Sequence, residues 1–135
     1  MAKNLKMANA SVNAEGDSLN AAGYNGGKLQ VYDGTQPTTA DDAVTTQVKL
    51  IEWTLPNPCF GSTVAGVLTA NAISDVTAIA SGVAAWYRCV SSGGTKLQDG
   101  SVGAGGTFDL VLDTTTITVG VTQHVTSWTH TIPKS

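Results

Sequence analysis

The stretch Gly82-Val-Ala-Ala-Trp-Tyr-Arg-Cys-Val90, followed by Ser91-Ser-Gly-Gly-Thr95, decides the fold that the sequence predicts. Valine and aromatic residues favour the pleated backbone of a strand. Side chains alternate between the two faces of a strand, so Ala84 and Trp86 share one face. The paired glycines of the second segment are typical of a hairpin turn. We therefore expect residues 82–90 to form a strand and residues 96–102 to return beside it.

The same period of two extends toward the N-terminus. Lys28-Leu-Gln-Val-Tyr32 is predicted to be a short strand that ends at the turn signal Asp33-Gly34. Within residues 48–55, which predict another strand, the apolar phase slips between Leu50 and Ile51. A slip of one residue turns buried side chains to the opposite face, so we expect a β-bulge at this point.

Short apolar segments separated by turn residues fill the rest of the chain. Seven or eight strands at this spacing are typical of a β-sandwich or barrel. We therefore predict an all-β fold, with a single β-sandwich or jelly-roll-like domain over residues 27–135. The further strands are expected over residues 64–73, 108–112, 117–121 and 125–132, with loops over residues 35–46 and 103–106.

The first 26 residues have a different pattern. Leu5, Val12 and Leu19 recur at roughly helical spacing, and Glu15-Gly16-Asp17 interrupts them. We predict that residues 1–26 form a partly helical N-terminal arm, with one or two short helical turns that end near the glycines at its end. Such an arm either caps the sheet or reaches a neighbouring molecule.

Charged residues are sparse in this chain. Asp, Glu, Lys and Arg make up 13% of its 135 residues, against about 25% in a typical soluble domain. A surface poor in Lys and Glu resembles the core of a protein interface, so we expect partners to cover much of it. The net charge is −3, which is unlike a basic nucleic-acid-binding protein. No window approaches the roughly 18 apolar residues of a membrane span. Neither nucleic acid nor a membrane is therefore an expected partner.

Two further features indicate the compartment. The N-terminal residues show no apolar signal segment, which predicts synthesis in the cytoplasm. Cys59 and Cys89 show no C-x-x-C spacing, and we expect them to be small buried side chains rather than a disulfide.

Histidine and serine residues offer few combinations for catalysis or metal binding. Ser127, His124 and Asp113 could in principle form a catalytic triad, but no G-x-S-x-G motif accompanies them. His124 and His130 are six residues apart, so on an extended strand they would lie about 20 Å apart, too far to bind one ion. We expect His130 to replace an apolar residue on an inward face and His124 to lie at the edge of a loop.

The carboxylates also lack evident partners. We expect Glu52 to face solvent or a neighbour, Asp99 to form a side-chain-to-backbone turn bond before Gly100, and Asp109 to lie on the outer face of a strand. None forms an evident pair of the kind that cleaves glycosides. We expect no enzyme activity, and no catalytic, cofactor-binding or metal-binding residue.

The three tryptophans allow two interpretations. Trp53, Trp86 and Trp128 could form a sugar-stacking platform, but each lies in phase with aliphatic neighbours. That phase favours a role in anchoring the core.

Six short segments, taken in their order along the chain, form a recognisable pattern, and the first is Gly26-Gly-Lys-Leu-Gln-Val-Tyr-Asp-Gly-Thr-Gln-Pro37. It is similar to the G-G-x-L-x-I-Y-D-G-T-x-P opening of small structural proteins of tailed bacteriophages. These proteins are usually encoded near the major capsid protein and resemble head decoration, or cement, proteins. The other segments are Trp53-Thr-Leu-Pro-Asn-Pro-Cys-Phe-Gly61, Val67-Leu-Thr-Ala-Asn-Ala-Ile73, Ala85-Trp-Tyr-Arg88, Gln98-Asp-Gly-Ser-Val-Gly103 and Ser127-Trp-Thr-His-Thr-Ile-Pro133.

The resemblance implies a β-sandwich or jelly-roll-like domain with a short helical arm and no catalytic motif. Its implied place is the exterior of the virion capsid, where it would bind the lattice of the major capsid protein, often as a homotrimer. Cys59 and His130 depart from the pattern, which has small or apolar residues there. We expect the arm and the loop over residues 35–46 to contact the lattice. Two alternatives stay open: a neck, collar or tail component, and a carbohydrate-binding accessory module with an exposed tryptophan.

Overall fold

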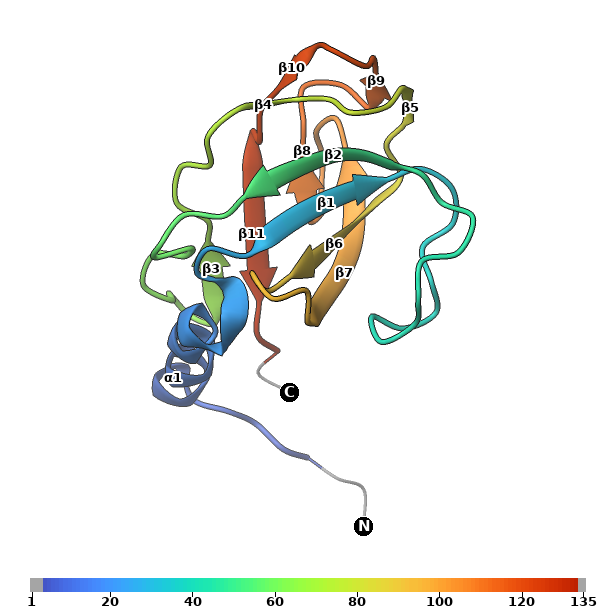
Figure 1. The fold of residues 1–135 in the computed structure, drawn as a ribbon. Helices are drawn as coiled ribbons and strands as arrows, with labels where there is room; N and C mark the ends of the chain where they lie inside the picture. Colours follow the sequence, from blue (N-terminus) through green and yellow to red (C-terminus); the bar gives the residue numbers. More distant parts are fainter. Residues whose placement is uncertain (1–3, 134–135) are drawn as a thin grey trace.

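The computed structural model describes residues 4–133 and shows a mainly-β fold with a short helical segment at one end (Figure 1). Residues 1–3 of the predicted arm and 134–135 of the predicted domain lie outside the described residues. The helical elements are α1 (Asn9–Ser18) and η1 (Asn20–Tyr24). The strands are β1 (Lys28–Tyr32), β2 (Lys49–Thr54), β3 (Val67–Thr69), β4 (Val76–Thr77), β5 (Gly82–Val83), β6 (Trp86–Val90), β7 (Lys96–Gly103), β8 (Leu110–Val111), β9 (Thr116–Ile117), β10 (Thr122–Gln123) and β11 (Ser127–Thr131).

Most of the strands belong to one mixed sheet of seven, in the order β2-β1-β6-β7-β8-β11-β3. All neighbours are antiparallel except β7 and β8. Strand β7 joins the two halves, because residues 96–101 pair with β6 while Val102 and Gly103 pair with β8. The sheet curls at this strand, so that β1, β2 and β6 cross in front of β8 and β11 (Figure 1). The β10-β4 and β5-β9 ladders lie at the upper end of the molecule.

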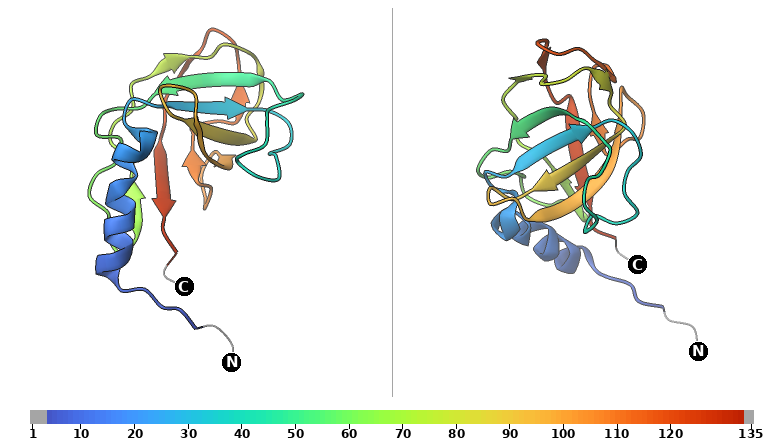
Figure 2. Two further views of the ribbon diagram at one scale, coloured as in Figure 1. Left: turned by 60° about the horizontal axis from the view of Figure 1, so that its bottom comes forward. Right: turned by 45° about the vertical axis from the view of Figure 1, so that its right-hand side comes forward.

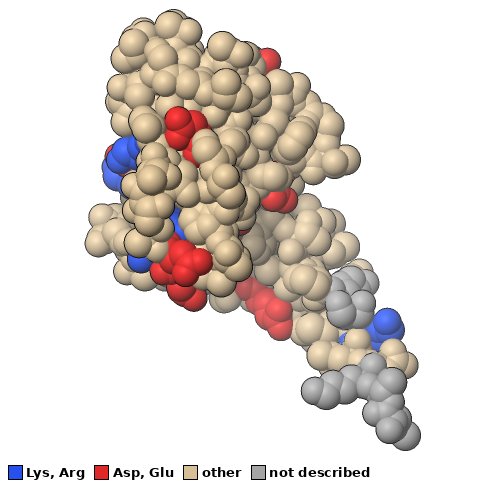
Figure 3. Space-filling view, turned by 90° about the vertical axis from the view of Figure 1, so that its right-hand side faces the viewer, with Lys and Arg blue, Asp and Glu red and all other residues tan. Residues whose placement is uncertain are grey.

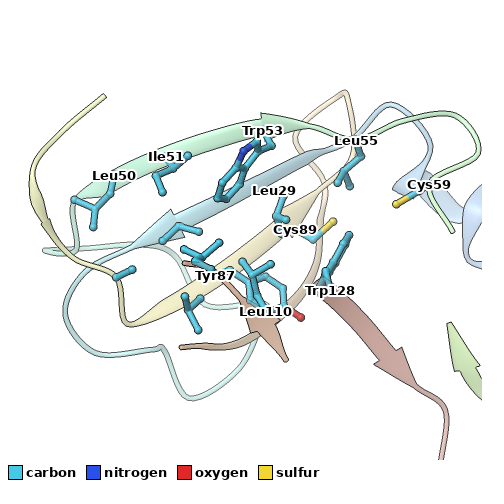
Figure 4. Close-up of a cluster of buried hydrophobic side chains, with 14 of the residues drawn as sticks. Leu29, Leu50, Ile51, Trp53, Leu55, Cys59, Tyr87, Cys89, Leu110 and Trp128 are labelled. Carbon is cyan, nitrogen blue, oxygen red and sulfur yellow. The ribbon is translucent and has the colours of Figure 1, made fainter. Parts of the chain in front are cut away.

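The core fills the space between the two halves of the curled sheet. Figure 4 shows side chains of β1, β2 and β6 pointing toward those of β8 and β11. Trp53 on β2 and Trp128 on β11 are buried on opposite halves of the sheet, and Tyr87 on β6 is buried in the same core. Trp128 meets Tyr87 edge to face, with ring centroids 5.8 Å apart. Aromatic residues bury large areas, so these three side chains contribute much of the driving force for closure.

The bulge that the apolar phase predicts in β2 is confirmed. Val31 pairs with Ile51 and Tyr32 pairs with Lys49, so Leu50 is the extra residue. Leu50 and Ile51 are both fully buried although they are consecutive. A bulge allows this because it turns one additional side chain toward the core.

The hairpin after β6 is also confirmed, but the strand before it is shorter than expected. Ser91 N–H donates to Thr95 O across 2.8 Å, and β7 returns beside β6. Residues 82–90 are two strands instead of one. Gly82 and Val83 pair with β9, and only residues 86–90 join the main sheet. The chain passes from one sheet to another between residues 83 and 86. This change depends on pairing with distant strands, so the local sequence pattern does not predict it.

Three other predicted strands are correct in place and too long, and a fourth overlaps the observed strand at a single residue. Residues 64–73 contain only β3, because Ala65 and Gly66 adopt positive φ angles of 50° and 84° and form a turn. Residues 108–112 contain the two-residue strand β8. Of residues 117–121 only Ile117 belongs to a strand, as the second residue of β9. Residues 125–132 contain β11, over Ser127–Thr131.

The helical segment lies within the predicted arm but is not interrupted where expected. Helix α1 continues through Glu15, Gly16 and Asp17. Gly16 is buried, and a Cβ there would overlap the side chains of Thr63 and Leu68. The glycine is therefore a close contact between helix and sheet rather than a break. The helical segment ends near Gly23, whose φ is 132°, as the glycine pattern predicts.

No helix within residues 4–133 combines the length and the apolar character that crossing a membrane requires.

Candidate interaction surfaces and polar clusters

An apolar tip, formed by residues 76–83 and 114–123, is the clearest candidate for a binding surface. These two segments carry β4, β5, β9 and β10 and hold each other through short ladders. Neither segment contains a charged residue. Their exposed apolar side chains are Ile79, Val83, Val119 and Val121, with exposed fractions of 55, 62, 56 and 48%.

The geometry of the tip explains why these side chains face outward. Ile117 fills the inward position and is 2% exposed. Immediately after it the chain turns at Gly120, whose φ is 84°, so Val119 and Val121 do not reach the core. Of the three alternating apolar residues in the strand expected over residues 117–121, only Ile117 is buried. The uppermost part of the molecule in Figure 3 is almost entirely uncharged. The tip is therefore apolar surface facing solvent.

A polar pocket of about 250 Å³ lies between β7 and β11. It brings ionisable side chains from three strands and from the residue before β8 to one surface. Its lining residues are Tyr87, Gln98, Asp99, Asp109, Thr129, His130 and Thr131.

The innermost carboxylate of this pocket is neutralised by a buried arginine. Arg88 Nε donates to Asp99 Oδ1 across 2.7 Å, and Arg88 Nη2 donates to Asp99 Oδ2 across 2.9 Å. Both side chains are 3% exposed, and the guanidinium also lies over the ring of Trp86. The expected turn bond of Asp99 is therefore wrong: its partner lies across the strand pair, opposite it in register.

Two phenols and an amide form a buried chain beside this ion pair. Tyr24 Oη donates to Gln98 Oε1 across 2.5 Å, and Gln98 Nε2 donates to Tyr87 Oη across 2.7 Å. Burial raises the pKa of Tyr87 to about 12, and burial also raises the pKa of Tyr24. Both phenols therefore stay protonated near neutral pH and act as hydrogen-bonding groups.

The rim of the pocket carries Asp109 and His130. Asp109 is exposed, as expected, and its Oδ2 accepts hydrogen bonds of 3.0 Å from Ser101 N–H and Ser101 Oγ–H. His130 lies on the same face of β11 as the buried Trp128, as expected, but it is only half-buried and lines the pocket. Burial lowers the pKa of His130, against the opposing effect of Asp109. The imidazole is therefore mainly neutral at pH 7.

The structure brings together two members of the conceivable triad. His124 Nε2 lies 2.8 Å from Asp113 Oδ2, and Thr126 Oγ1 donates to Asp113 Oδ1 across 3.0 Å. His124 and Asp113 are 48 and 61% exposed. Ser127 makes no side-chain hydrogen bond to either within residues 4–133. In that same part of the chain, no three His, Cys, Asp or Glu side chains converge as a metal site.

The remaining candidates lie in the core or on strand faces. Trp53, Trp86 and Trp128 are 0, 1 and 1% exposed, which confirms their role as anchors and leaves none for a sugar platform. Cys59 and Cys89 are free and buried, and burial raises the pKa of Cys59 to about 12.

Glu52 is partly exposed and forms a 2.8 Å ion pair with Lys49 on the same strand. Gln30 Nε2 on neighbouring β1 donates to the same carboxylate oxygen across 2.9 Å. The hydrogen bond from Lys49 lowers the pKa of Glu52. Within the described chain, this carboxylate is held by side chains of β1 and β2 on a partly exposed strand face.

The arm packs on its own sheet through polar side chains. Figure 2 shows α1 alongside β3. Oxygen atoms of four arm side chains accept hydrogen bonds from four backbone N–H groups within residues 59–66. The pairs are Asn13 with Gly66, Asp17 with Thr63, Asn20 with Phe60 and Asn25 with Cys59, at 2.8–2.9 Å. The structure therefore has the arm capping its own domain, and only residues 4–8 extend beyond it as an extended segment.

The loop over residues 35–46 is present as expected. It is closed at its base by Asp33 Oδ1, which accepts from Val48 N–H across 2.6 Å, and by Gln47, whose side chain bonds to both Thr35 and Thr45. The loop itself carries Asp41 and Asp42 and is largely exposed.

Comparison with protein-family models, curated proteins and solved structures finds no match to this chain.

Proposed function

We propose that this chain is a structural protein of a tailed-phage virion, a decoration protein that binds the outer surface of the major capsid protein lattice and catalyses no reaction. It would be made in the bacterial cytoplasm and would act as a homo-oligomer, as the resemblance of residues 26–133 implies. The curled sheet would then be a sandwich-like variant, with the two halves of one sheet in place of two separate sheets.

The observation that carries this proposal is the apolar tip. Four aliphatic side chains stand about half exposed on two segments without any charge. Apolar surface exposed in a cluster marks a binding site more often than isolated apolar residues do. Valine, isoleucine and threonine also lose little side-chain entropy when a partner covers them.

The energetics suit a lattice component. Full burial of a valine or isoleucine side chain contributes about 1.5–3 kcal/mol, so half-exposed side chains add roughly 1 kcal/mol each. One such contact is weak. Repetition over a lattice, and linkage between copies in an oligomer, raise the effective concentration and hence the avidity.

A neck, collar or tail component is the second candidate, since the same tip could bind another virion protein. The carbohydrate-binding alternative requires an exposed tryptophan, and the buried positions of all three tryptophans oppose it.

The deciding experiment uses purified virions of the phage that encodes the chain. We expect many copies per particle by quantitative mass spectrometry, and density for this domain on the outside of the head in a cryo-EM reconstruction. Density confined to the neck or tail would replace the head assignment with the second candidate. Absence from purified virions would overturn the proposal.

Single substitutions test the surface itself. Ile79→Asp and Val119→Asp place a charge within the tip and should abolish addition of purified protein to heads that lack it. Val64→Asp is the matched control, because Val64 is 70% exposed and lies outside the tip. Equal loss in all three variants would show that the tip is not the docking surface.

A further inference from the structure

We propose that the extended N-terminal segment of one copy, residues 4–8, binds at the mouth of the polar pocket of a second copy, with Leu5 against Phe108 and Lys6 paired with Asp109. This contact between copies does not depend on the proposed function, because it uses neither the tip nor a capsid.

The first half of the contact is the segment itself. Residues 4–6 are exposed, and Leu5 has an exposed fraction of 73%, the largest among the apolar side chains described. Lys6 forms no ion pair within residues 4–133. Figure 1 shows this segment leaving α1 and projecting away from the sheet. An exposed leucine next to an unpaired lysine on an extended chain is suited to insertion into a partner.

The second half is the pair Phe108-Asp109, of which Asp109 lines the pocket. Phe108 is 47% exposed, and its ring covers Gly103, where a Cβ would overlap it. The neighbouring Asp109 uses only Oδ2 for its hydrogen bonds to Ser101. Its Oδ1 has no hydrogen-bond partner within residues 4–133. The Phe108 ring over Gly103 and the Asp109 carboxylate at Ser101 therefore place an apolar surface and an available carboxylate oxygen two residues apart along β7, beside the pocket.

The two halves are complementary in order and in charge. Each places an exposed apolar side chain immediately before an exposed charged one, of opposite sign in the two cases. The deeper carboxylate does not compete for the lysine, because Arg88 neutralises Asp99. The mostly neutral imidazole of His130 adds no full positive charge at the rim. Lys96 is an exposed lysine at the start of β7. A charge change there serves as a control for effects of net charge alone.

Such a contact joins two different surfaces of the same chain. A head-to-tail contact of this kind gives a closed ring if its rotation closes, and an open chain if it does not. Five extended residues reach about 17 Å, so the contact requires the partner's pocket to lie within that distance of the start of α1.

Sedimentation velocity of the full chain at low ionic strength tests the proposal. We expect association that depends on protein concentration, weakened about tenfold by Lys6→Glu or Asp109→Lys and recovered when both are combined. Lys96→Glu changes the net charge equally and should leave association unchanged. A chain that stays monomeric at every concentration, or equal weakening by Lys96→Glu, would overturn the contact.

Asp109 also bonds to Ser101, so a second measurement leaves it unaltered. A Leu5→Cys chain mixed with a Phe108→Cys chain should form an intermolecular disulfide faster than with a Val64→Cys chain, whose cysteine replaces a side chain that is 70% exposed. The native cysteines are buried and should not compete. Equal rates for the two mixtures would contradict the proposed geometry. Head binding by the Lys6→Glu variant separates this contact from the proposed function. If the variant binds heads normally, the proposed function stands, and the sedimentation and disulfide measurements alone decide the contact between copies.

Discussion

The contact between the two halves of the curled sheet and the contact between the arm and residues 59–66 are built from different chemistry. The first consists of buried aliphatic and aromatic side chains such as Trp53, Leu110 and Trp128. The second has one fully buried apolar side chain from α1, Val12, and a row of amide and carboxylate groups that bind backbone N–H groups. Apolar burial depends on area and tolerates small shifts, whereas each hydrogen bond requires its own partner at a defined place. The arm therefore fixes the position of residues 59–66, a segment whose backbone makes few hydrogen bonds to the main sheet.

The largest effect should come from the apolar half. Trp53→Ala should lower the free energy of unfolding by about 3–5 kcal/mol, because it removes a fully buried ring and leaves a cavity. Urea denaturation followed by circular dichroism measures this change. Val48→Ala, at an exposed position just before β2, is the control and should change stability by less than about 0.5 kcal/mol. Similar changes in the free energy of unfolding for the two variants would show that Trp53 contributes no more to stability than an exposed residue.

An intermediate effect is expected at the centre of the polar row. Asn20 binds both groups of Phe60, accepting from its N–H across 2.9 Å and donating to its C=O across 3.0 Å. Asn20→Ala should cost about 2 kcal/mol, since it leaves two partly buried backbone groups unsatisfied. Hydrogen exchange at the Phe60 amide should accelerate more than exchange in β1 or β6. Asn57→Ala, an exposed asparagine outside the row, should change neither measurement.

The smallest effect should be a dependence on pH at Asp17. The hydrogen bond from the Thr63 backbone N–H lowers the pKa of this carboxyl below 3.8. A lowered pKa in the folded state means that the stabilisation is complete above the unfolded value and is lost as the pH falls through the folded value. Thermal unfolding between about pH 5 and pH 2 should therefore show a steeper decline for the native chain than for Asp17→Asn. Glu15→Gln, on the exposed side of the same helix, should not change the slope.

The packing of the sheet could largely be predicted from the sequence, whereas the contacts of the arm could not. The bulge at Leu50 could be predicted because two consecutive apolar residues within a strand conflict with alternation. Gly16 was misinterpreted as an interruption, since its reason is a close approach to Leu68, far along the chain. The bonds from Asn13 and Asp17 to residues 66 and 63 are equally non-local.

The polar surface shows the same limit. Asp99 precedes a glycine, a local signal for a turn, but its partner Arg88 is set by strand register. The outward direction of Val119 and Val121 results from a turn beyond a two-residue strand, and apolar period alone suggests the opposite. Local patterns thus predicted which segments are strands, while the pocket and the tip depend on pairings between distant segments.

The spacing of the arm bonds has a consequence during translation. Helix α1 has 10 residues, too few for a stable helix in isolation, and its hydrogen-bond partners lie 46 and 53 residues further along the chain. At typical bacterial synthesis rates those partners follow several seconds later. The N-terminus of the nascent chain therefore spends that interval without its docking site, and the ribosome must complete residue 66 before the last bond of the row can form.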